Sequence, residues 1–235
     1  MKTENSGNAG CLQRDSVEHE GYAEAYSIAS QNKEETDGTG LLERILDRNN
    51  LNRAYKRVKA NKGAPGIDGM TIEGTFAWLK EHKTEWLESI RTGEYKPSPV
   101  RRKEIPKPDG GVRKLGIPTI RDRIIQQAIT QQLVPIFEPL FSEGSYGYRP
   151  GRSAQQAVQK IREYAEQGYK FATVLDLSKY FDTLNHELLM NLLRKQIKDK
   201  RVIQLVKKYL KSGVMENGVV VKTTSGTQQR GNLYP

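Results

Sequence analysis

Two short strand-like runs on either side of a tight turn constrain the fold of this chain more than any other feature of its sequence. The runs Val100-Arg-Arg-Lys-Glu-Ile105 and Val112-Arg-Lys-Leu-Gly-Ile117 flank the turn Pro106-Lys-Pro-Asp-Gly-Gly111. Because Asp-Gly between two β-prone runs is a strong hairpin signal, the sequence predicts an antiparallel ribbon here. Nine basic and three acidic side chains lie between Lys96 and Arg123, so the ribbon should carry a positive surface.

Helical periodicity on both sides of the ribbon indicates an α+β fold. Helices are predicted from Asn50 or Leu51 to Ala60, from Thr75 to Arg91, after Thr119, after Ser153, and over 183–197 and 199–212. The helix after Thr119 should be apolar on one face, and Asp182 is predicted to cap a helix. The run Lys170-Phe-Ala-Thr-Val-Leu175 is predicted to be a buried strand, and Val219-Val-Val-Lys222 a last short strand.

The charge of the chain is divided unevenly along its length. Residues 1–40 hold three basic and eight acidic side chains, whereas residues 41–235 hold 35 basic and 20 acidic ones. Residues 1–40 also lack apolar periodicity, which predicts a disordered acidic leader. The basic remainder indicates a polyanionic partner, with nucleic acid the leading candidate. A protein that is merely soluble and basic is the alternative.

The single cysteine, Cys11, excludes a disulfide framework and a cysteine-rich zinc site. No apolar run approaches the length of a membrane span, and the N-terminus lacks the pattern of a signal peptide. These features predict a cytoplasmic protein with no membrane partner.

An aspartate at the end of the predicted buried strand is the first candidate for chemistry. Asp176 follows Val174-Leu175 directly. A carboxylate on rigid backbone at a sheet edge can hold a hard cation, and Mg²⁺ prefers carboxylate and carbonyl oxygens. The carbonyl of Leu177 would add a second ligand. The alternative is that Asp176 only accepts hydrogen bonds from backbone amides at the turn.

Several motifs, in one order along residues 41–235, resemble the group II intron-type reverse transcriptases. Asp176-Leu-x-x-x-Phe-Asp182 resembles their first catalytic motif, and the segment from Ile105 to Ala128 resembles their fingers motif. Three further segments resemble family elements: Asn61–Met70 the N-terminal extension, Gly144–Ala157 a Tyr/Phe-Arg-Pro-x-Arg-Ser element, and Ser225–Pro235 a Gly-Thr-Pro-Gln-Gly-Gly pattern. In the last segment Gln228, Arg230 and Tyr234 depart from the family pattern.

The resemblance implies roles for single residues. Asp176 and the Leu177 carbonyl would hold Mg²⁺ in two-metal nucleotidyl transfer. Phe181 would close off the ribose 2′ position. The residues implied in nucleotide binding are Lys107, Arg113, Arg101, Phe181 and Gln229.

Basic side chains on the hairpin, beside aromatic residues, or at the glycine-rich loop after a basic helix are candidates for RNA contacts. They are Lys62, Arg102, Lys103, Arg149 and Arg152. A solvated surface is the alternative for the hairpin, an ordinary interhelix loop for Lys62, and a structural tether for Arg149 and Arg152.

The implied fold is a right-hand polymerase in which helical fingers with a basic β-hairpin pack on an incomplete antiparallel palm sheet. The predicted divisions are a leader (1–40), an N-terminal helical extension of the fingers (41–95), the fingers (96–168) and a truncated partial palm (169–235). The implied partners are template or intron RNA, a DNA primer and a deoxynucleoside triphosphate. An exposed sheet edge also predicts a homodimer.

The sequence contains no Asp-Asp pair, whereas the family's second motif is Tyr-x-Asp-Asp. We therefore expect weak or absent Mg²⁺ binding and no polymerase activity from this chain alone. Two other interpretations stay open. One is a non-enzymatic, maturase-like module that binds intron RNA, and the other is the product of a decayed gene.

Overall fold

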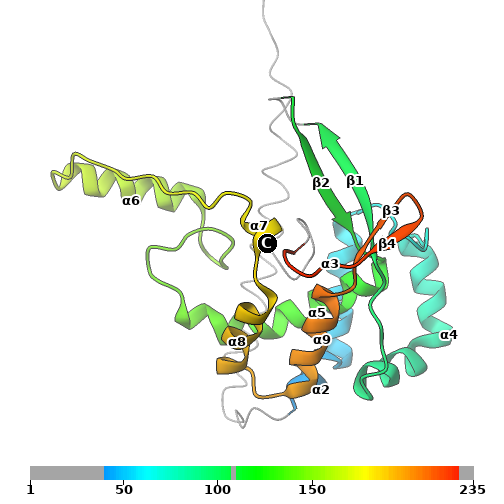
Figure 1. Ribbon diagram of the computed structural model, residues 1–235. Helices are drawn as coiled ribbons and strands as arrows, with labels where there is room; N and C mark the ends of the chain where they lie inside the picture. The colour runs from blue at the N-terminus through cyan, green and yellow to red at the C-terminus, as the bar shows by residue number, and fades with distance from the viewer. Residues whose placement is uncertain (1–39, 107–109, 228–235) are drawn as a thin grey trace, which may run out of the picture. The chain divides into compact units, whose positions relative to one another are not determined.

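The computed structural model describes residues 40–106 and 110–227. The predictions for the leader up to residue 39, for Lys107 and for Gln229 lie outside the described residues. The helices are α2 (Leu41–Ile45), α3 (Arg48–Ala60), α4 (Ile72–Arg91), α5 (Ile120–Phe137), the 3-10 turn η1 (Glu138–Leu140), α6 (Ala154–Glu166), α7 (Tyr180–Thr183), α8 (His186–Gln196) and α9 (Lys200–Leu210). The strands are β1 (Val100–Pro106), β2 (Val112–Ile117), β3 (Val214–Glu216) and β4 (Val219–Val221) (Figure 1).

The chain divides into two compact units. We call the described residues 133–176 the α6 unit, and the described residues 40–132 and 177–227 the sheet unit. Helix α5 begins in the sheet unit, and its last residues, from Leu133, belong to the α6 unit. Within the described residues, no helix combines the length and the apolarity that a bilayer span requires.

The predicted hairpin forms the long ribbon of the sheet unit (Figure 1). Strands β1 and β2 pair antiparallel from Arg101 opposite Ile117 to Pro106 opposite Val112. Both strands match their predicted bounds to within one residue. The hairpin prediction is therefore confirmed.

The sheet is mixed rather than purely antiparallel. Its strand order is β2-β1-β3-β4, and β3 pairs parallel with β1, with Val100 opposite Val214. Strand β4, which the sequence predicts, pairs antiparallel with β3. The prediction of an antiparallel palm sheet is therefore wrong. Strands β3 and β4 instead extend the hairpin sheet, because β3 pairs parallel with β1.

Helices α2, α3, α5 and α9 supply most of the fully buried side chains of the sheet unit. The amide nitrogen of Asn50 in α3 donates to the carbonyls of Ile45 at 2.8 Å and Ala128 at 3.1 Å. The side-chain amide of Gln131 donates in turn to Asn50 Oδ1 at 2.8 Å. These bonds join α2, α3 and α5, and they satisfy polar groups whose burial would otherwise be costly.

Helix α5 is buried on more than the one apolar face that its sequence predicts. Ile125 and Ile129 are fully buried, but Asp122, Gln127 and Gln131 are buried as well. Its cap is as predicted, since the backbone amide of Asp122 donates to the hydroxyl of Thr119. A periodicity count treats polar residues as solvent-facing, so it cannot identify a helix that is enclosed nearly all round.

The predicted buried strand over residues 170–175 is wrong. This segment of the α6 unit has no regular secondary structure, and the exposed fractions of Phe171, Val174 and Leu175 are 98%, 90% and 89%. A strand is defined by its ladder partners. In the described part of the chain no strand pairs with these residues.

The turn after this segment also differs from its prediction. Asp182 lies inside the four-residue helix α7, whereas Asn185 caps α8 by accepting a hydrogen bond from the backbone amide of Leu188 at 3.0 Å. Helix α8 therefore begins at His186, three residues later than predicted.

Candidate nucleic-acid and nucleotide interface

The register of the hairpin sorts its cations onto two faces. Residues directly opposite one another share a face, and the side chains alternate along each strand. Lys103 lies opposite Leu115 and Arg113 opposite Ile105, which places Arg101, Lys103 and Arg113 on one face of the ribbon. Arg102 and Lys114 lie on the other face. Three of the predicted contact residues therefore form a single positive row.

Two arginines at the base of the ribbon make intramolecular contacts. Arg101 donates from Nε and Nη2 to the carbonyl of Pro65 at 3.1 and 2.8 Å. On the other face, Arg102 Nε forms a 2.8 Å ion pair with Glu216 of β3. Lys103 and Arg113, farther along the ribbon, have exposed side chains. The exposed pair is the part of this surface that best suits a phosphate backbone.

The glycine-rich loop at 61–69 is held against the ribbon and the start of α5. Arg123 donates to the carbonyls of Ala64 and Pro118, and burial lowers the pKa of its guanidinium. A Cβ at Gly66 would lie 2.6 Å from the Cα of Thr119, so only glycine allows this close approach. The loop is thus an anchored element, and Lys62 stands exposed at its start.

Polar clustering below the ribbon is a feature that the sequence alone does not reveal. The buried carboxylate of Asp122 accepts hydrogen bonds from Tyr95 at 2.6 Å, from Thr119 at 2.6 Å and from the Ser98 amide at 3.2 Å. Burial raises the pKa of Asp122, with the neighbouring donors opposing that rise. The cluster fixes the entry to β1 against α5, which positions the ribbon.

A turn near Phe181 packs against the segment that leads to the predicted nucleotide contact Gln229. The amide of Thr227 donates to the Phe181 carbonyl at 2.6 Å, and the amide of Gly226 donates to the Leu184 carbonyl at 2.8 Å. A Cβ at Gly226 would lie 2.6 Å from the carbonyl oxygen of Asp182. The sheet unit therefore brings two segments with predicted nucleotide contacts into direct contact, although Gln229 itself is outside the described residues.

The predicted metal ligands are at the surface. Asp176 and Leu177 are both exposed. Among the described residues, no group of three or more His, Cys, Asp or Glu could hold a metal ion. Mg²⁺ takes about six oxygen ligands in near-octahedral geometry, and one carboxylate with one carbonyl supplies too few. The described residues do not by themselves make up a magnesium site.

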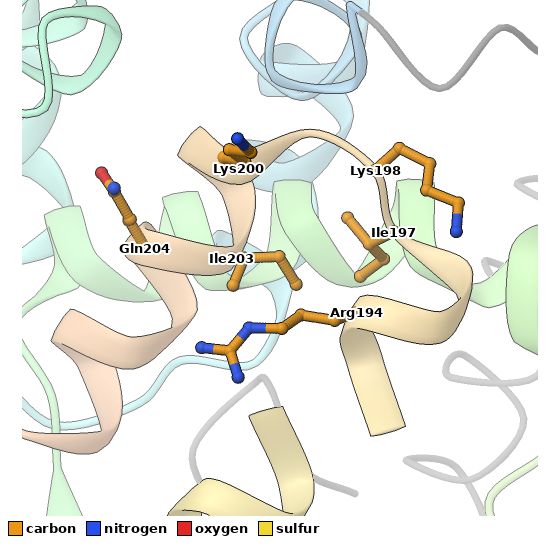
Figure 2. A pocket seen from close by; sticks show the side chains of 6 residues that line it. All are labelled: Arg194, Ile197, Lys198, Lys200, Ile203 and Gln204. Atoms are coloured by element: carbon orange, nitrogen blue, oxygen red, sulfur yellow. The ribbon is translucent and has the colours of Figure 1, made fainter. Parts of the chain in front are cut away.

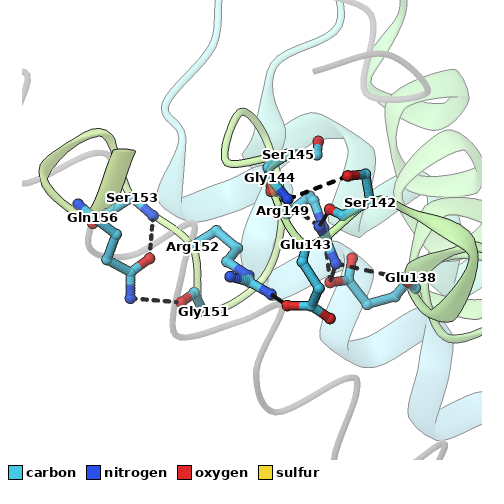
Figure 3. A network of polar contacts seen from close by, with 10 residues as sticks. All are labelled: Glu138, Ser142, Glu143, Gly144, Ser145, Arg149, Gly151, Arg152, Ser153 and Gln156. Atoms are coloured by element: carbon cyan, nitrogen blue, oxygen red, sulfur yellow. Dashed lines mark hydrogen bonds and ion pairs between the residues drawn. The ribbon is translucent and has the colours of Figure 1, made fainter. Parts of the chain in front are cut away.

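In the α6 unit, Arg149 sits at the centre of a buried network (Figure 3). Its guanidinium forms an ion pair with Glu138 at 2.7 Å and donates to the carbonyls of Ser142 at 2.6 Å and Ser145 at 2.9 Å. The exposed fraction of its side chain is 7%. These contacts favour the structural alternative for Arg149, because its donors already bind the loop.

Arg152 lies at the rim of the same network. It forms a 2.7 Å ion pair with Glu143 and stacks over the ring of Tyr146 at 5.5 Å. The hydrogen bond from Arg152 lowers the pKa of Glu143. Glu143 is exposed, whereas Tyr146 is half-buried. Ion pairs at the surface contribute little to stability, so the Arg152–Glu143 pair is not a strong structural tether.

A pocket of about 380 Å³ between α8 and α9 is a further cationic feature of the sheet unit (Figure 2). Figure 2 shows the side chains of Ile197 and Ile203 between the two helices, with Arg194 extending alongside them. The lining residues are Arg194, Ile197, Lys198, Lys200, Ile203 and Gln204. The sequence does not predict this pocket, because its cations come from α8, α9 and the loop between them and surround one space only in the fold.

Comparison with known proteins identifies the family. A family model described as reverse transcriptase (RNA-dependent DNA polymerase) matches residues 105–232, which is more than half of the chain. Protein YkfC of Escherichia coli is 36% identical over 83% of this chain and 53% of its own length. The group II intron-encoded protein LtrA of Lactococcus lactis is 38% identical over 77% of this chain and 30% of its own length.

The fold has a counterpart among solved structures. A chain of the partial Cas6-RT-Cas1–Cas2 complex superposes on 82% of this chain, and on 32% of its own length, with a TM-score of 0.55 at 21% identity. This likeness concerns the fold alone.

The chain spans about half of the length of Protein YkfC and less than a third of the length of LtrA. From the matched residues and these relatives, the chain belongs to the reverse transcriptase (RNA-dependent DNA polymerase) family and is related to the group II intron-encoded proteins.

Proposed function

We propose that this chain is the template-binding and nucleotide-binding part of an RNA-directed DNA polymerase of group II intron type. The observation that carries the proposal is the positive row on one face of the ribbon, which combines Arg101, Lys103 and Arg113. Exposed Lys103 and Arg113 bind the phosphates of RNA or of an incoming nucleotide. Arg101, which is bonded to Pro65, orients the base of the row.

In this proposal the residues near Phe181 form the wall beside the sugar of a bound deoxynucleotide. The contact of Gly226 and Thr227 with this turn supports the assignment, since it leads the chain toward Gln229. Asp176 is the proposed first metal-binding carboxylate of the family's two-metal chemistry. Reverse transcriptases generally use Mg²⁺. The ion would stabilise charge on the phosphates during nucleotidyl transfer, and this chain's own residues would hold the nucleic acid and nucleotide in place.

Primer extension tests the catalytic part of the proposal. The 235-residue chain is incubated with an RNA template, an annealed DNA primer, deoxynucleotides and Mg²⁺. We expect no extension above the level of Asp176→Ala, because the chain lacks an Asp-Asp pair. Extension by the wild-type chain that disappears in Asp176→Ala would show that the residues present are sufficient for catalysis.

RNA binding without polymerisation is the second candidate function. The exposed cations of the ribbon and the pocket between α8 and α9 favour it, because neither depends on Asp176. Fluorescence anisotropy with a labelled structured RNA measures the affinity at several salt concentrations. Binding that weakens steeply with salt, without primer extension, supports this candidate. An affinity no tighter than millimolar at moderate salt would exclude both functions for this chain.

A further inference from the structure

The imidazole of His186 is a buried polar side chain outside the predicted contact residues. His186 is the first residue of α8, and its exposed fraction is 5%. Its Nε2 lies 2.6 Å from the carbonyl oxygen of Gly226. Because a carbonyl oxygen only accepts, Nε2 must carry the ring proton and donate it. In the described part of the chain the other ring nitrogen, Nδ1, is buried without a hydrogen-bond partner. The hydrogen bonding of the ring is thus directed to Gly226.

This bond is one of three that hold residues 226–227 against the turn from Phe181 to His186, an arrangement we call the 181–226 joint. The amide of Gly226 donates to the Leu184 carbonyl at 2.8 Å, and the amide of Thr227 donates to the Phe181 carbonyl at 2.6 Å. Those two bonds join backbone groups, which every residue type except proline supplies. The bond from His186 is made by a side chain, so it ties the position of the joint to one particular residue.

Gly226 fits the joint for two independent reasons. Its φ of +77° lies in the left-handed region, which favours glycine. A Cβ at this position would also lie 2.8 Å from the carbonyl oxygen of Phe181, too close for any other residue type. The backbone at Gly226 can therefore approach the turn closely enough for the ring of His186 to reach its carbonyl.

A ring that only fills space is the simpler explanation of His186. An apolar ring would fill the same space without burying polar nitrogens, whose desolvation costs free energy unless they are hydrogen-bonded. His186 instead buries both ring nitrogens and places one of them on a carbonyl three residues before the predicted nucleotide contact Gln229. The position of this bond favours a role in holding the joint over a role in packing alone.

We propose that His186 is a positioning residue for nucleotide binding, because its hydrogen bond to Gly226 fixes the segment that leads to Gln229 against the turn that carries Phe181. The proposal rests on the proposed function, in which Phe181 forms the wall beside the sugar of a deoxynucleotide. His186 acts through this turn and the backbone of residues 226–227 rather than through the nucleotide itself. Loss of its bond lets the turn move away from the sugar and makes room for a 2′ hydroxyl.

Nuclear magnetic resonance of the wild-type chain tests the bond without any substitution. Long-range ¹H–¹⁵N spectra at mildly alkaline pH distinguish the two neutral tautomers of an imidazole. We expect the proton of His186 on Nε2. His82 is an internal control, because its Nδ1 lies 3.0 Å from the Trp78 carbonyl and should carry the proton instead. A proton on Nδ1 of His186 overturns the proposal.

Two substitutions separate the hydrogen-bond donor of His186 from its ring. His186→Phe keeps a ring of similar size without the donor, whereas the side-chain amide of His186→Gln supplies a donor at the same number of bonds from the backbone. Hydrogen exchange of the Gly226 and Thr227 amides should be about tenfold faster in His186→Phe and close to wild type in His186→Gln.

The amide of Ile203 in α9, which donates to the Asp199 carbonyl, is the control for general destabilisation. Its exchange should change much less than that of Gly226 in both variants. Equal exchange of Gly226 in His186→Phe and the wild type, or acceleration of Ile203 by the same factor, overturns the proposal. If His186→Phe does not fold, the tautomer of the wild type and the exchange of His186→Gln still test it.

Nucleotide selectivity separates positioning from a merely structural role. Equilibrium dialysis measures the affinities of dATP and ATP for the chain with Mg²⁺, an RNA template and a primer that lacks its 3′ hydroxyl. Partial unfolding would weaken both nucleotides by the same factor, whereas a displaced Phe181 lowers the preference for dATP. We expect that preference to fall about tenfold in His186→Phe and to be kept in His186→Gln.

The outcomes of these measurements distinguish the two proposals. An unchanged preference for dATP in His186→Phe, together with faster exchange at Gly226, overturns the positioning role and leaves the proposed function intact. If the wild type binds neither nucleotide, the proposed function fails and the positioning role fails with it, even where the tautomer and exchange results show the hydrogen bond.

Discussion

Single buried polar side chains determine how the helices of the sheet unit fit together. Asn50 illustrates this, since its amide group bridges the carbonyls of Ile45 and Ala128 while its oxygen accepts from Gln131. No other residue type of similar size donates and accepts in this way. The helix pattern shows Asn50 only as a polar residue at a helix start, so its burial becomes visible only in the fold.

Asn50→Ala should destabilise the chain by about 2–3 kcal/mol, because it removes the buried side-chain hydrogen bonds to the carbonyls of Ile45 and Ala128 and from the amide of Gln131. Urea denaturation followed by circular dichroism measures the change. Asn49→Ala is the matched control, because the side chain of Asn49 is exposed and its loss should cost less than about 0.5 kcal/mol. Equal effects of the two substitutions would argue against the bridging role.

Asp199 makes stability depend on pH. Burial by itself raises the pKa of its carboxyl, but hydrogen bonds from Arg201 and from the Leu42 amide outweigh burial, so the pKa lies below its ordinary value. Because the folded-state pKa is lowered, the contribution of Asp199 to the free energy of unfolding is full above the unfolded pKa of about 3.9. It is lost as pH falls through the folded pKa.

We expect Asp199→Asn to be less stable than the wild type by about 1–2 kcal/mol at pH 6, because hydrogen bonds to a charged acceptor are stronger than those to a neutral one. The difference should shrink below about pH 4, where the wild-type carboxyl becomes protonated. Urea denaturation from pH 6 to pH 3 measures both curves. A difference that stays constant over this range would show that the charge of Asp199 is not responsible.

At the scale of secondary-structure elements, the proposed function rests mainly on the β1–β2 ribbon. Its register separates the exposed Lys103 and Arg113 from Lys114, which lies on the other face opposite Glu104. This separation gives the ribbon one face suited to polyanions and one of mixed charge. The two faces can be tested against each other within a single element.

Lys103→Gln and Arg113→Gln should each weaken RNA binding and reduce the slope of log affinity against log salt concentration by about 0.7–0.9. Lys114→Gln should change the slope much less, because Lys114 lies on the mixed-charge face. Anisotropy titrations from low to moderate salt measure these slopes. If all three substitutions act alike, the RNA does not distinguish the faces, and the proposed positive row is wrong.

Local signals predicted the elements whose structure depends on nearby residues. The hairpin, the Thr119 cap and the Ser153 cap all appear as predicted, since turn and cap chemistry acts over a few residues. The strand at 170–175 was mispredicted because β structure depends on partner strands that a local pattern cannot specify. Arg149 was ambiguous for a related reason, as only the fold shows that its guanidinium is enclosed by carbonyls.

At the scale of the whole molecule, distant parts of the chain complete one sheet. The residues of β1 and β3 fall in separate predicted divisions, the fingers and the partial palm, yet the two strands pair directly in the sheet unit. The roles of individual site residues remain proposals, because Lys107 and Gln229 lie outside the described residues and Asp176 lies in the other unit. Motif order identified the family correctly, since it samples many positions at once.

The parallel pairing of β1 with β3 has a consequence for how the chain emerges from the ribosome. Arg102 and its partner Glu216 are 114 residues apart in sequence. At about 5–20 residues per second, roughly 6–23 s of translation separate their synthesis. A hairpin closes in about 1–10 µs, so β1 and β2 can pair long before β3 exists. The backbone groups of Val100 and Arg101 that face β3 therefore stay without their strand partner during this interval, and the sheet is completed only after Met215 has been synthesised.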